Sequence, residues 1–206
     1  MNERYARERL AEICRLLYDR KLTVSAGGNM SVRLNESEVL ITPSGRNKGM
    51  LTPDDMVKLS LDGKVLSEGR PSIEHRFHLA LYRMNPDTGA VVHCHPLHCT
   101  ALAVSGRPVR CNITPEGVLL LGDVPTVPYF TPGSEELVEA VAKAGKAKAM
   151  LMAKHGALTQ GRNLEEAFDR MEELEFQAAL QLLAGDVEDL PEDEIAKLEA
   201  MRWPSW

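Results

Sequence analysis

The chain has 206 residues, of which 44% are hydrophobic and 26% charged, and its formal net charge is -6 at pH 7. Such a composition is typical of globular proteins, and the length predicts one domain, residues 1–206, with a single substantial core. The acidic balance argues against nucleic-acid binding, which needs a basic face.

The N-terminal segment and the cysteines bear on the compartment. The segment MNERYARERLAEIC alternates charges where a secretion signal needs a continuous apolar stretch, and no apolar run is long enough for a membrane span. We therefore expect a cytoplasmic protein with no membrane partner. The cysteines contain no CxxC pair, so we expect free, mostly buried thiols rather than a disulfide scaffold or a thiolate zinc site at Cys14, Cys94, Cys99 and Cys111.

The first half of the chain predicts short strands between two helices. The expected elements are a helix over 3–20, two β-prone pieces around Gly27-Gly28, a strand from Glu38 that runs into a Pro-Ser-Gly turn over 43–45, and two short strands over 56–67 about an Asp62-Gly63 turn. Helical spacing follows Pro71, with Ser72 as N-cap, and continues to Pro86. An apolar run then predicts a buried strand that ends near His95.

The second half predicts more helices interleaved with strands. The expected elements are a helix over 98–105, strands broken by prolines over 118–130, a helix over 133–144 capped by Ser134, a buried strand over 148–156, and helices over 163–185 and 191–201. The early hairpin signal means that the sheet is mixed. We expect an α/β protein with helices covering a sheet that is not wholly parallel.

Three of the six histidines lie within six positions in AVVHCHPLH, residues 90–98. Because side chains alternate along a strand, His93 and His95 share one face with Val91, with their Cα atoms ~6.6 Å apart. That spacing suits two ligands of one metal ion. A shared ion would also offset the free-energy cost of burying two imidazoles without a partner. The pattern by itself leaves a packing role open.

Two further residues complete a candidate metal site. His155 follows a buried strand and enters a glycine-marked turn, and Glu74 lies in the first turn of the helix that precedes the His93 strand. A catalytic zinc ion takes three protein ligands and keeps one open position. His155 alone is equally compatible with an ordinary hydrogen-bonded histidine, and we interpret His75 and His78 as surface or packing residues.

Two glycine-containing segments, SAGGNMS and TPSG, predict a phosphate cradle. Glycines let the backbone approach a ligand closely, and neutral donors are supplied by Asn29, Ser31, Ser44 and Ser72. A simple turn at Gly27-Gly28 is the alternative.

Five segments in the same order, GGNMSVR, ITPSG, PSIEHRFH, AVVHCHPLHCTAL and AKHGAL, resemble the class II aldolase/adducin family, most closely its L-fuculose-1-phosphate aldolase branch. The resemblance implies a three-layer α/β/α fold with a mixed, mostly antiparallel sheet. It also implies a homotetramer with active sites between subunits. It assigns one zinc ion, with Mn²⁺ or Co²⁺ as alternatives, to Glu74, His93, His95 and His155. It assigns the substrate phosphate to Gly28, Asn29, Ser44, Gly45 and Ser72.

The activity implied by the resemblance is that of a zinc-dependent aldehyde-lyase. It cleaves a ketose 1-phosphate, of the fuculose, ribulose or 5-deoxy/5-methylthio-pentulose type, to dihydroxyacetone phosphate and an aldehyde. Glu74 then shuttles the proton on the enediolate carbon. The family's tyrosine acid falls at Thr114, so Glu116 is the candidate for the second acid/base. Ser72 is followed by Ile73 where that branch has a second serine, which removes one phosphate donor.

Three alternatives share the resemblance. A methylthioribulose-1-phosphate dehydratase uses a similar site, with a glutamate near Glu116 as acid/base. A sugar-phosphate 4-epimerase is disfavoured because it has aspartate where Glu74 stands, and a non-enzymatic adducin-like module because the ligand positions are intact. Trp203 and Trp206 either line a neighbouring subunit's site or pack on the last helix.

Overall fold

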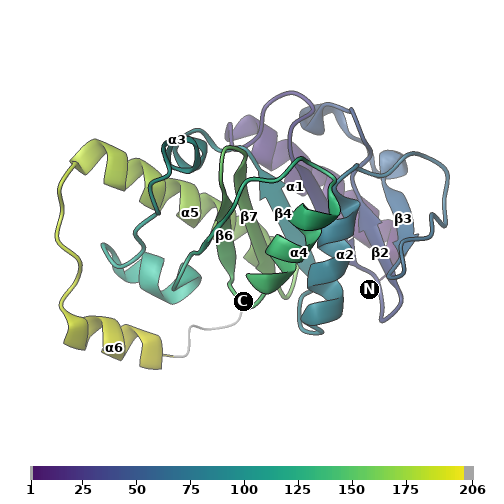
Figure 1. Ribbon diagram of the computed structural model, residues 1–206. Coiled ribbons are helices and arrows are strands. Elements are labelled where there is room, and N and C mark those ends of the chain that lie inside the picture. The colour runs from purple at the N-terminus through teal and green to yellow at the C-terminus, as the bar shows by residue number, and fades with distance from the viewer. Residues whose placement is uncertain (1, 202–206) are drawn as a thin grey trace.

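Figure 1 shows the computed structural model, in which residues 2–201 are described. One seven-stranded sheet runs in the order β3-β2-β1-β4-β7-β6-β5. Its strands are β1 (Asn29–Arg33), β2 (Glu38–Ile41), β3 (Val57–Ser60), β4 (Ala90–Cys94), β5 (Thr126–Val127), β6 (Ala149–Met152) and β7 (Gly156–Gly161). Only β5 and β6 pair in parallel among these strands. The expected mixed, mostly antiparallel sheet is confirmed.

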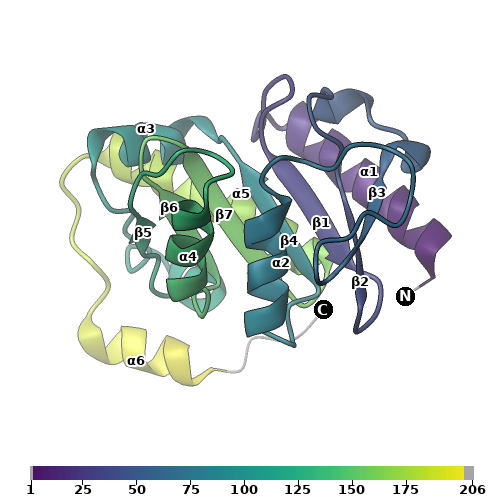
Figure 2. The ribbon, with the colours of Figure 1, turned by 45° about the vertical axis from the view of Figure 1, so that its right-hand side comes forward.

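Helices cover both faces of this sheet (Figure 2). They are α1 (Glu3–Asp19), α2 (His75–Met84), α3 (Leu97–Ser105), α4 (Glu135–Lys143), α5 (Leu164–Ala184) and α6 (Glu192–Ala200). Helices α1, α3 and α5 share one apolar core with Val92 and Cys94, whereas α2 and α4 share the other with Val91. Alternating side chains of β4 therefore feed both cores, as predicted, and the three-layer fold is confirmed.

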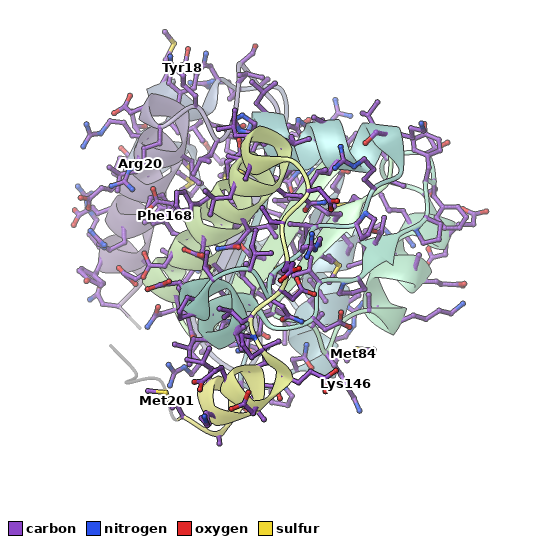
Figure 3. The ribbon with its side chains drawn as sticks, turned by 90° about the vertical axis from the view of Figure 1, so that its left-hand side faces the viewer. Tyr18, Arg20, Met84, Lys146, Phe168 and Met201 are labelled. Carbon is purple, nitrogen blue, oxygen red and sulfur yellow. The ribbon has the colours of Figure 1, made fainter. Side chains whose placement is uncertain are left out.

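The longest helix, α5, packs against both α1 and α3 on one face of the sheet. Asn163 caps α5 by accepting a hydrogen bond from the Glu166 amide, and the helix ends before Gly185. The Arg20 guanidinium, just after α1, lies 5.3 Å from the ring centroid of Phe168 on α5 (Figure 3). Helix α6 lies away from the sheet and contacts the 117–121 segment (Figure 1). No helix in residues 2–201 is long and apolar enough to cross a membrane.

The predicted start of the second helix was wrong. Ser72 is not its N-cap, because α2 begins at His75 and Glu74 occupies the cap position. The backbone before it continues an extended path: Pro71 bridges Pro43, and the Ser72 amide donates to the Thr42 carbonyl at 3.2 Å. These pairings hold the chain in an extended conformation up to Ser72.

The predicted strands over 118–130 were also largely wrong. Residues Gly117–Leu121 form one turn of π-helix (η3), and only Thr126–Val127 is a strand. A short apolar run fits either structure by periodicity. Here a Cβ on Gly117 would lie 2.3 Å from the Cys111 carbonyl oxygen, so the glycine permits a close turn that a strand would not make.

The hairpin about Asp62-Gly63 is confirmed only in its first strand. Its return leg is a single bridge between Leu59 and Val65. Two 3-10 turns, η1 (Lys48–Met50) and η2 (Pro53–Asp55), connect β2 to β3. All four cysteines are free and buried, as expected. Trp203 and Trp206 lie outside the described residues.

Candidate metal centre

His93 provides the fixed side of the cluster. It lies fully buried on β4, next to β1 on one side and β7 on the other. Its Nδ1 lies 2.9 Å from the Ala157 carbonyl oxygen, an acceptor, so Nδ1 carries the proton and Nε2 presents a lone pair. Burial, with a smaller effect of His155, lowers the pKa of His93 to about 3. The ring is therefore a neutral ligand at neutral pH.

Two more imidazoles meet His93 at one end of the sheet. Nε2 of His95, just beyond β4, lies 3.3 Å from Nε2 of His93. His155 lies in the turn between β6 and β7, with its ring centroid 4.7 Å from that of His93 and 5.1 Å from that of His95. Burial is the largest cause that lowers the pKa of His95, also to about 3. One ligating nitrogen from each ring lies within 4.8 Å of the others.

Glu74 completes the cluster from helix α2, which covers one face of the sheet. Its side chain is buried at the N-terminus of α2, where Oε2 lies 3.5 Å from His93 Nε2 and Oε1 lies 3.6 Å from His155 Nε2. Oε1 has no hydrogen-bond partner in the described structure. A buried carboxylate oxygen without a donor is costly unless a cation compensates it.

These distances fit one tetrahedral ion. With Zn–N and Zn–O bonds of ~2.0–2.1 Å, neighbouring ligand atoms of a tetrahedron lie ~3.4 Å apart. Nε2 of His93 lies 3.3 Å from that of His95 and 3.5 Å from Glu74 Oε2. Nε2 of His155 lies 3.6 Å from Glu74 Oε1, and the nitrogens of the three histidines lie within 4.8 Å of one another. Neutral imidazoles with one carboxylate are a donor set that zinc prefers. The four residues could therefore hold a divalent metal, as the sequence predicts.

A buried hydrogen-bond chain extends from Glu74 into the α2–β1 interface. Asn29 Nδ2 donates to Glu74 Oε2 at 2.8 Å, and its Oδ1 lies 2.5 Å from His78 Nε2. His78 Nδ1 lies 2.7 Å from Ser31 Oγ, which lies 2.8 Å from the Tyr82 hydroxyl. His78 is fully buried, so the surface alternative for it was wrong. Its spacing of four residues from Glu74 was the available signal.

The expected phosphate residues lie at the start of β1, in the case of Asn29, and on the loops before β1, after β2 and before α2. Gly28 has φ +70° and passes so close to β4 that a Cβ would lie 2.4 Å from the His93 carbonyl oxygen. Ser72 Oγ accepts a hydrogen bond from the Glu74 amide at 3.3 Å. The Ser44 amide donates to the Arg70 carbonyl, so Ser44 and Gly45 lie beside the segment that ends at Ser72. Their role in phosphate binding stays a prediction.

Lys48 is a residue of this region that sequence reasoning missed. It is buried, and its Nζ donates to the carbonyl oxygens of Ala26 and Arg46, each at 2.9 Å. The lysine thus ties the glycine turn before Asn29 to the turn after Gly45. Burial lowers the pKa of this amine.

Glu116 does not join the cluster within one chain. Its side chain is exposed, and in residues 2–201 no hydrogen bond or ion pair connects it to Glu74 or the three histidines. Its charge acts instead on Glu173, whose pKa is raised mainly by burial and further by Glu116. Its predicted acid/base role stays a prediction.

A hollow of about 1040 Å³ lies elsewhere, between the end of α1 and α5. Several carboxylates line it, among them Glu165, Asp169 and Glu172, and none of the candidate ligands does. Arg20, Lys21 and Arg162 also line it, so its walls carry both signs of charge, and because none of the candidate ligands borders it we place no metal-dependent site there.

Comparisons with known proteins identify the family. The family model described as Class II Aldolase and Adducin N-terminal domain matches residues 8–182. A 3-oxo-tetronate 4-phosphate decarboxylase of Pectobacterium atrosepticum is 38% identical over 96% of this chain and 94% of its own. An L-fuculose phosphate aldolase of Methanocaldococcus jannaschii is 37% identical over 86% of this chain and 96% of its own.

Solved structures give the same result. A putative aldolase/epimerase/decarboxylase from Escherichia coli matches with a TM-score of 0.93 and 37% identity, covering 97% of this chain and 100% of the other. An L-fuculose 1-phosphate aldolase matches with a TM-score of 0.88 and 32% identity, covering 95% and 94%. The predicted resemblance is confirmed, and the chain belongs to the class II aldolase/adducin family.

Proposed function

We propose that this protein is a metal-dependent carbon–carbon lyase that decarboxylates a 3-oxo-tetronate 4-phosphate to dihydroxyacetone phosphate and CO₂. Zinc, held by Glu74, His93, His95 and His155, is the proposed cofactor. The identity to a decarboxylase of this name over almost the whole chain supports the substrate. This proposal refines the ketose 1-phosphate aldolase expected from the sequence, which becomes the second candidate.

The two candidate reactions share their central chemistry. In both substrates a carbon bearing a hydroxyl lies between the bond that breaks and a ketone whose other substituent is a phosphorylated CH₂ group. The bond's electron pair passes to this carbon and the neighbouring ketone, giving the same enediolate. Protonation of the carbon then yields dihydroxyacetone phosphate. The leaving fragment is CO₂ in one reaction and an aldehyde in the other.

A divalent metal in this site supplies Lewis-acid stabilisation of the negative charge that develops on the substrate oxygens. Glu74 takes up a proton from solvent and delivers it to the enediolate carbon, since it is the carboxylate that reaches the histidine cluster. Asn29, Ser72 and the glycine turns orient the phosphate through neutral donors. His93 stays neutral because burial lowers its pKa to about 3, and the bond from Nδ1 to the Ala157 carbonyl fixes which nitrogen carries the proton.

The observation that carries the decarboxylase assignment is the number of acid/base groups at the cluster. A retro-aldol cleavage needs Glu74 and a second group that removes the proton of the departing hydroxyl, whereas CO₂ departs without a hydroxyl proton. In residues 2–201, Glu74 is the one carboxylate within 4 Å of His93 or His155, and Glu116 has no bond to the cluster. One chain thus supplies what decarboxylation needs.

The aldolase remains the second candidate because of a different observation. An L-fuculose phosphate aldolase is 37% identical over most of the chain. We infer that the protein is a homotetramer with active sites at subunit interfaces, and in that assembly the exposed Glu116 is free to reach a neighbouring subunit's site. In this case Glu116 is the second base.

The test compares both substrate classes. Zinc-loaded protein is incubated with 3-oxo-tetronate 4-phosphate, fuculose 1-phosphate and ribulose 1-phosphate in separate reactions, and CO₂ and dihydroxyacetone phosphate are measured. We expect the two products in equal amounts from the oxo acid, far above the spontaneous rate. The Glu74→Gln variant controls for catalysis by metal alone. Triose phosphate from a ketose 1-phosphate, without accelerated CO₂ release, would overturn the decarboxylase assignment in favour of the aldolase.

A further inference from the structure

We propose that His78 is a positioning residue, which holds Glu74 in its metal-facing orientation through a directed hydrogen-bond chain with Asn29, Ser31 and Tyr82. The inference rests on the proposed function only where it concerns proton transfer by Glu74. The orientation of the carboxylate follows from the contacts themselves.

The chain joins two elements along alternating positions. Asn29 and Ser31 are two residues apart on β1 and point to the same face of the sheet. Glu74, His78 and Tyr82 are four residues apart on α2 and its cap, which places them on one face of the helix. Met30, between the two strand residues, belongs to the opposite core. The polar side chains therefore interlock within an otherwise apolar helix–sheet contact.

The donor and acceptor roles in the hydrogen-bond chain follow from Glu74, where the chain ends. An ionised Glu74 can only accept, so Asn29 turns its Nδ2 to the carboxylate and its Oδ1 to His78. His78 must then donate from Nε2, which leaves Nδ1 as an acceptor for the Ser31 hydroxyl. Because Ser31 donates to His78, its oxygen accepts from the Tyr82 hydroxyl. Each group has one defined role, and His78 is the neutral Nε2–H tautomer.

Burial makes this arrangement hard to replace. Asn29, Ser31, His78 and Tyr82 are each at most 3% exposed, so water cannot readily substitute for a lost partner. Glu74 depends on the chain more than its position at a helix cap suggests, because its side chain makes no capping bond. Among residues 2–201 its carboxylate accepts one hydrogen bond, from Asn29, and Oε1 accepts none.

The asymmetry between the two carboxylate oxygens has a chemical consequence. The chain holds Oε2, whereas Oε1 is free of donors and faces His155 at 3.6 Å. Glu74 can therefore exchange partners at Oε1 while Oε2 stays anchored. Without His78, Asn29 is free to rotate, and the carboxylate loses the support that fixes both its metal contact and its proton-transfer geometry.

Two substitutions at His78 separate positioning from packing. His78→Gln places an amide NH₂ close to the position of Nε2 and keeps the donor to Asn29. His78→Asn is shorter, reaches Ser31 in place of Nδ1, and leaves Asn29 without its donor. We measure zinc affinity by competition with a chromophoric chelator, and exchange of the dihydroxyacetone phosphate carbon-bound proton in deuterated water.

We expect His78→Asn to weaken zinc binding and slow proton exchange by about 10-fold or more each, with little change in the KM for dihydroxyacetone phosphate. His78→Gln should recover most of both. Leu79→Ala is the control for loss of stability. Leu79 is buried on the same helix but takes no part in the hydrogen-bond chain, so this variant should keep wild-type zinc affinity. Equal zinc affinity and exchange rates in the Gln and Asn variants would overturn the proposal.

Two results call for a further measurement: a His78→Asn variant that does not fold, and a wild-type protein without activity. If His78→Asn does not fold, Ser31→Ala replaces it: loss of the hydroxyl donor frees the His78 tautomer, so zinc affinity should fall, and an unchanged affinity would overturn the proposal. If the wild-type enzyme exchanges no proton and shows no lyase activity, the proposed function fails. The order of zinc affinities, which needs no substrate, then still decides the positioning role.

Discussion

The Nδ1 nitrogen of His93 lies 2.9 Å from the carbonyl oxygen of Ala157, on the neighbouring strand β7. The pairing of β4 with β7 thereby decides which ring nitrogen faces Glu74 and the other histidines. A metal ligand whose second nitrogen is bonded to a backbone carbonyl is fixed in both tautomer and ring orientation. The sheet itself thus prepares His93 as a ligand.

The first prediction concerns metal content. His93→Ala and His155→Ala should each lose most of the bound divalent metal, expected at about one ion per chain in the wild type, because either change leaves an incomplete donor set. Elemental analysis of the purified variants measures this directly.

His98→Ala is the matched control. His98 is close in sequence to His93 but bonds Glu175 on α5, so this variant should keep its metal. Full occupancy in His93→Ala or His155→Ala would show that the histidine concerned is not a ligand.

The sequence predicts the ligand cluster better than it predicts what surrounds it. Period-two patterning places His93 and His95 on one face of a strand, and an apolar run places His155 just after another buried strand. A capping signal likewise locates α4 at Ser134. These features depend on local patterns that a single sequence contains. That the three histidines meet depends on the pairing of β4 with β7 and of β7 with β6, which the family resemblance implied and periodicity alone does not.

Other features depend on long-range contacts. The start of α2 is set by the pairing of Ser72 with Thr42, thirty positions earlier in the chain. The run over 117–121 becomes a π-helix because Gly117 approaches Cys111. The role of His78 is visible only when β1 lies against α2, since its partners Asn29 and Ser31 come from another element. Periodicity in a single sequence carries none of these pairings.

A second prediction addresses the phosphate cradle. Ser72 Oγ accepts from the Glu74 amide, which leaves its hydroxyl proton free for a ligand. Ser72→Ala should raise the KM for the phosphorylated substrate about 10-fold, by the usual cost of about 1–3 kcal/mol for one lost hydrogen bond, with a smaller change in kcat. Steady-state kinetics measure this split. An unchanged KM would remove Ser72 from the cradle.

The Asn29→Ala variant should behave differently from Ser72→Ala. The Asn29 side chain bonds both Glu74 and His78, so its loss should lower kcat as well as substrate affinity. Comparison of the two variants in the same assay separates phosphate binding from support of Glu74. A pure KM effect in Asn29→Ala would contradict the role in support.

A third prediction concerns Lys48. Lys48→Met keeps the length of the side chain but leaves the carbonyls of Ala26 and Arg46 without their donor. We expect a loss of about 1–3 kcal/mol in the free energy of unfolding and weaker binding of dihydroxyacetone phosphate, because both turns relax. Denaturant unfolding and calorimetric titration measure the two effects. Lys64→Met, at an exposed lysine, should change neither.

A fourth prediction separates the two candidate reactions at Glu116. Decarboxylation needs no base for a departing hydroxyl, so Glu116→Gln should keep CO₂ release within about 3-fold of wild type. An aldolase that uses Glu116 should lose about 10²-fold or more, the usual size of general-base effects. A large loss of CO₂ release in this variant would show that Glu116 acts in decarboxylation after all.

The last prediction tests Glu74 as ligand and proton carrier. A glutamine at this position keeps the shape and one oxygen, but it cannot carry the proton. With three histidines in place, Glu74→Gln should therefore retain much of its metal, while turnover falls about 10²-fold or more. In deuterated water without other substrates, the wild type should exchange one carbon-bound hydrogen of dihydroxyacetone phosphate stereospecifically, and the variant should not. This exchange reverses the last step of either reaction, so it isolates the proton transfer from the identity of the leaving group. Normal exchange in a metal-loaded Glu74→Gln protein would assign the proton to another group, and the free Oε1 of Glu74 would then serve the metal alone.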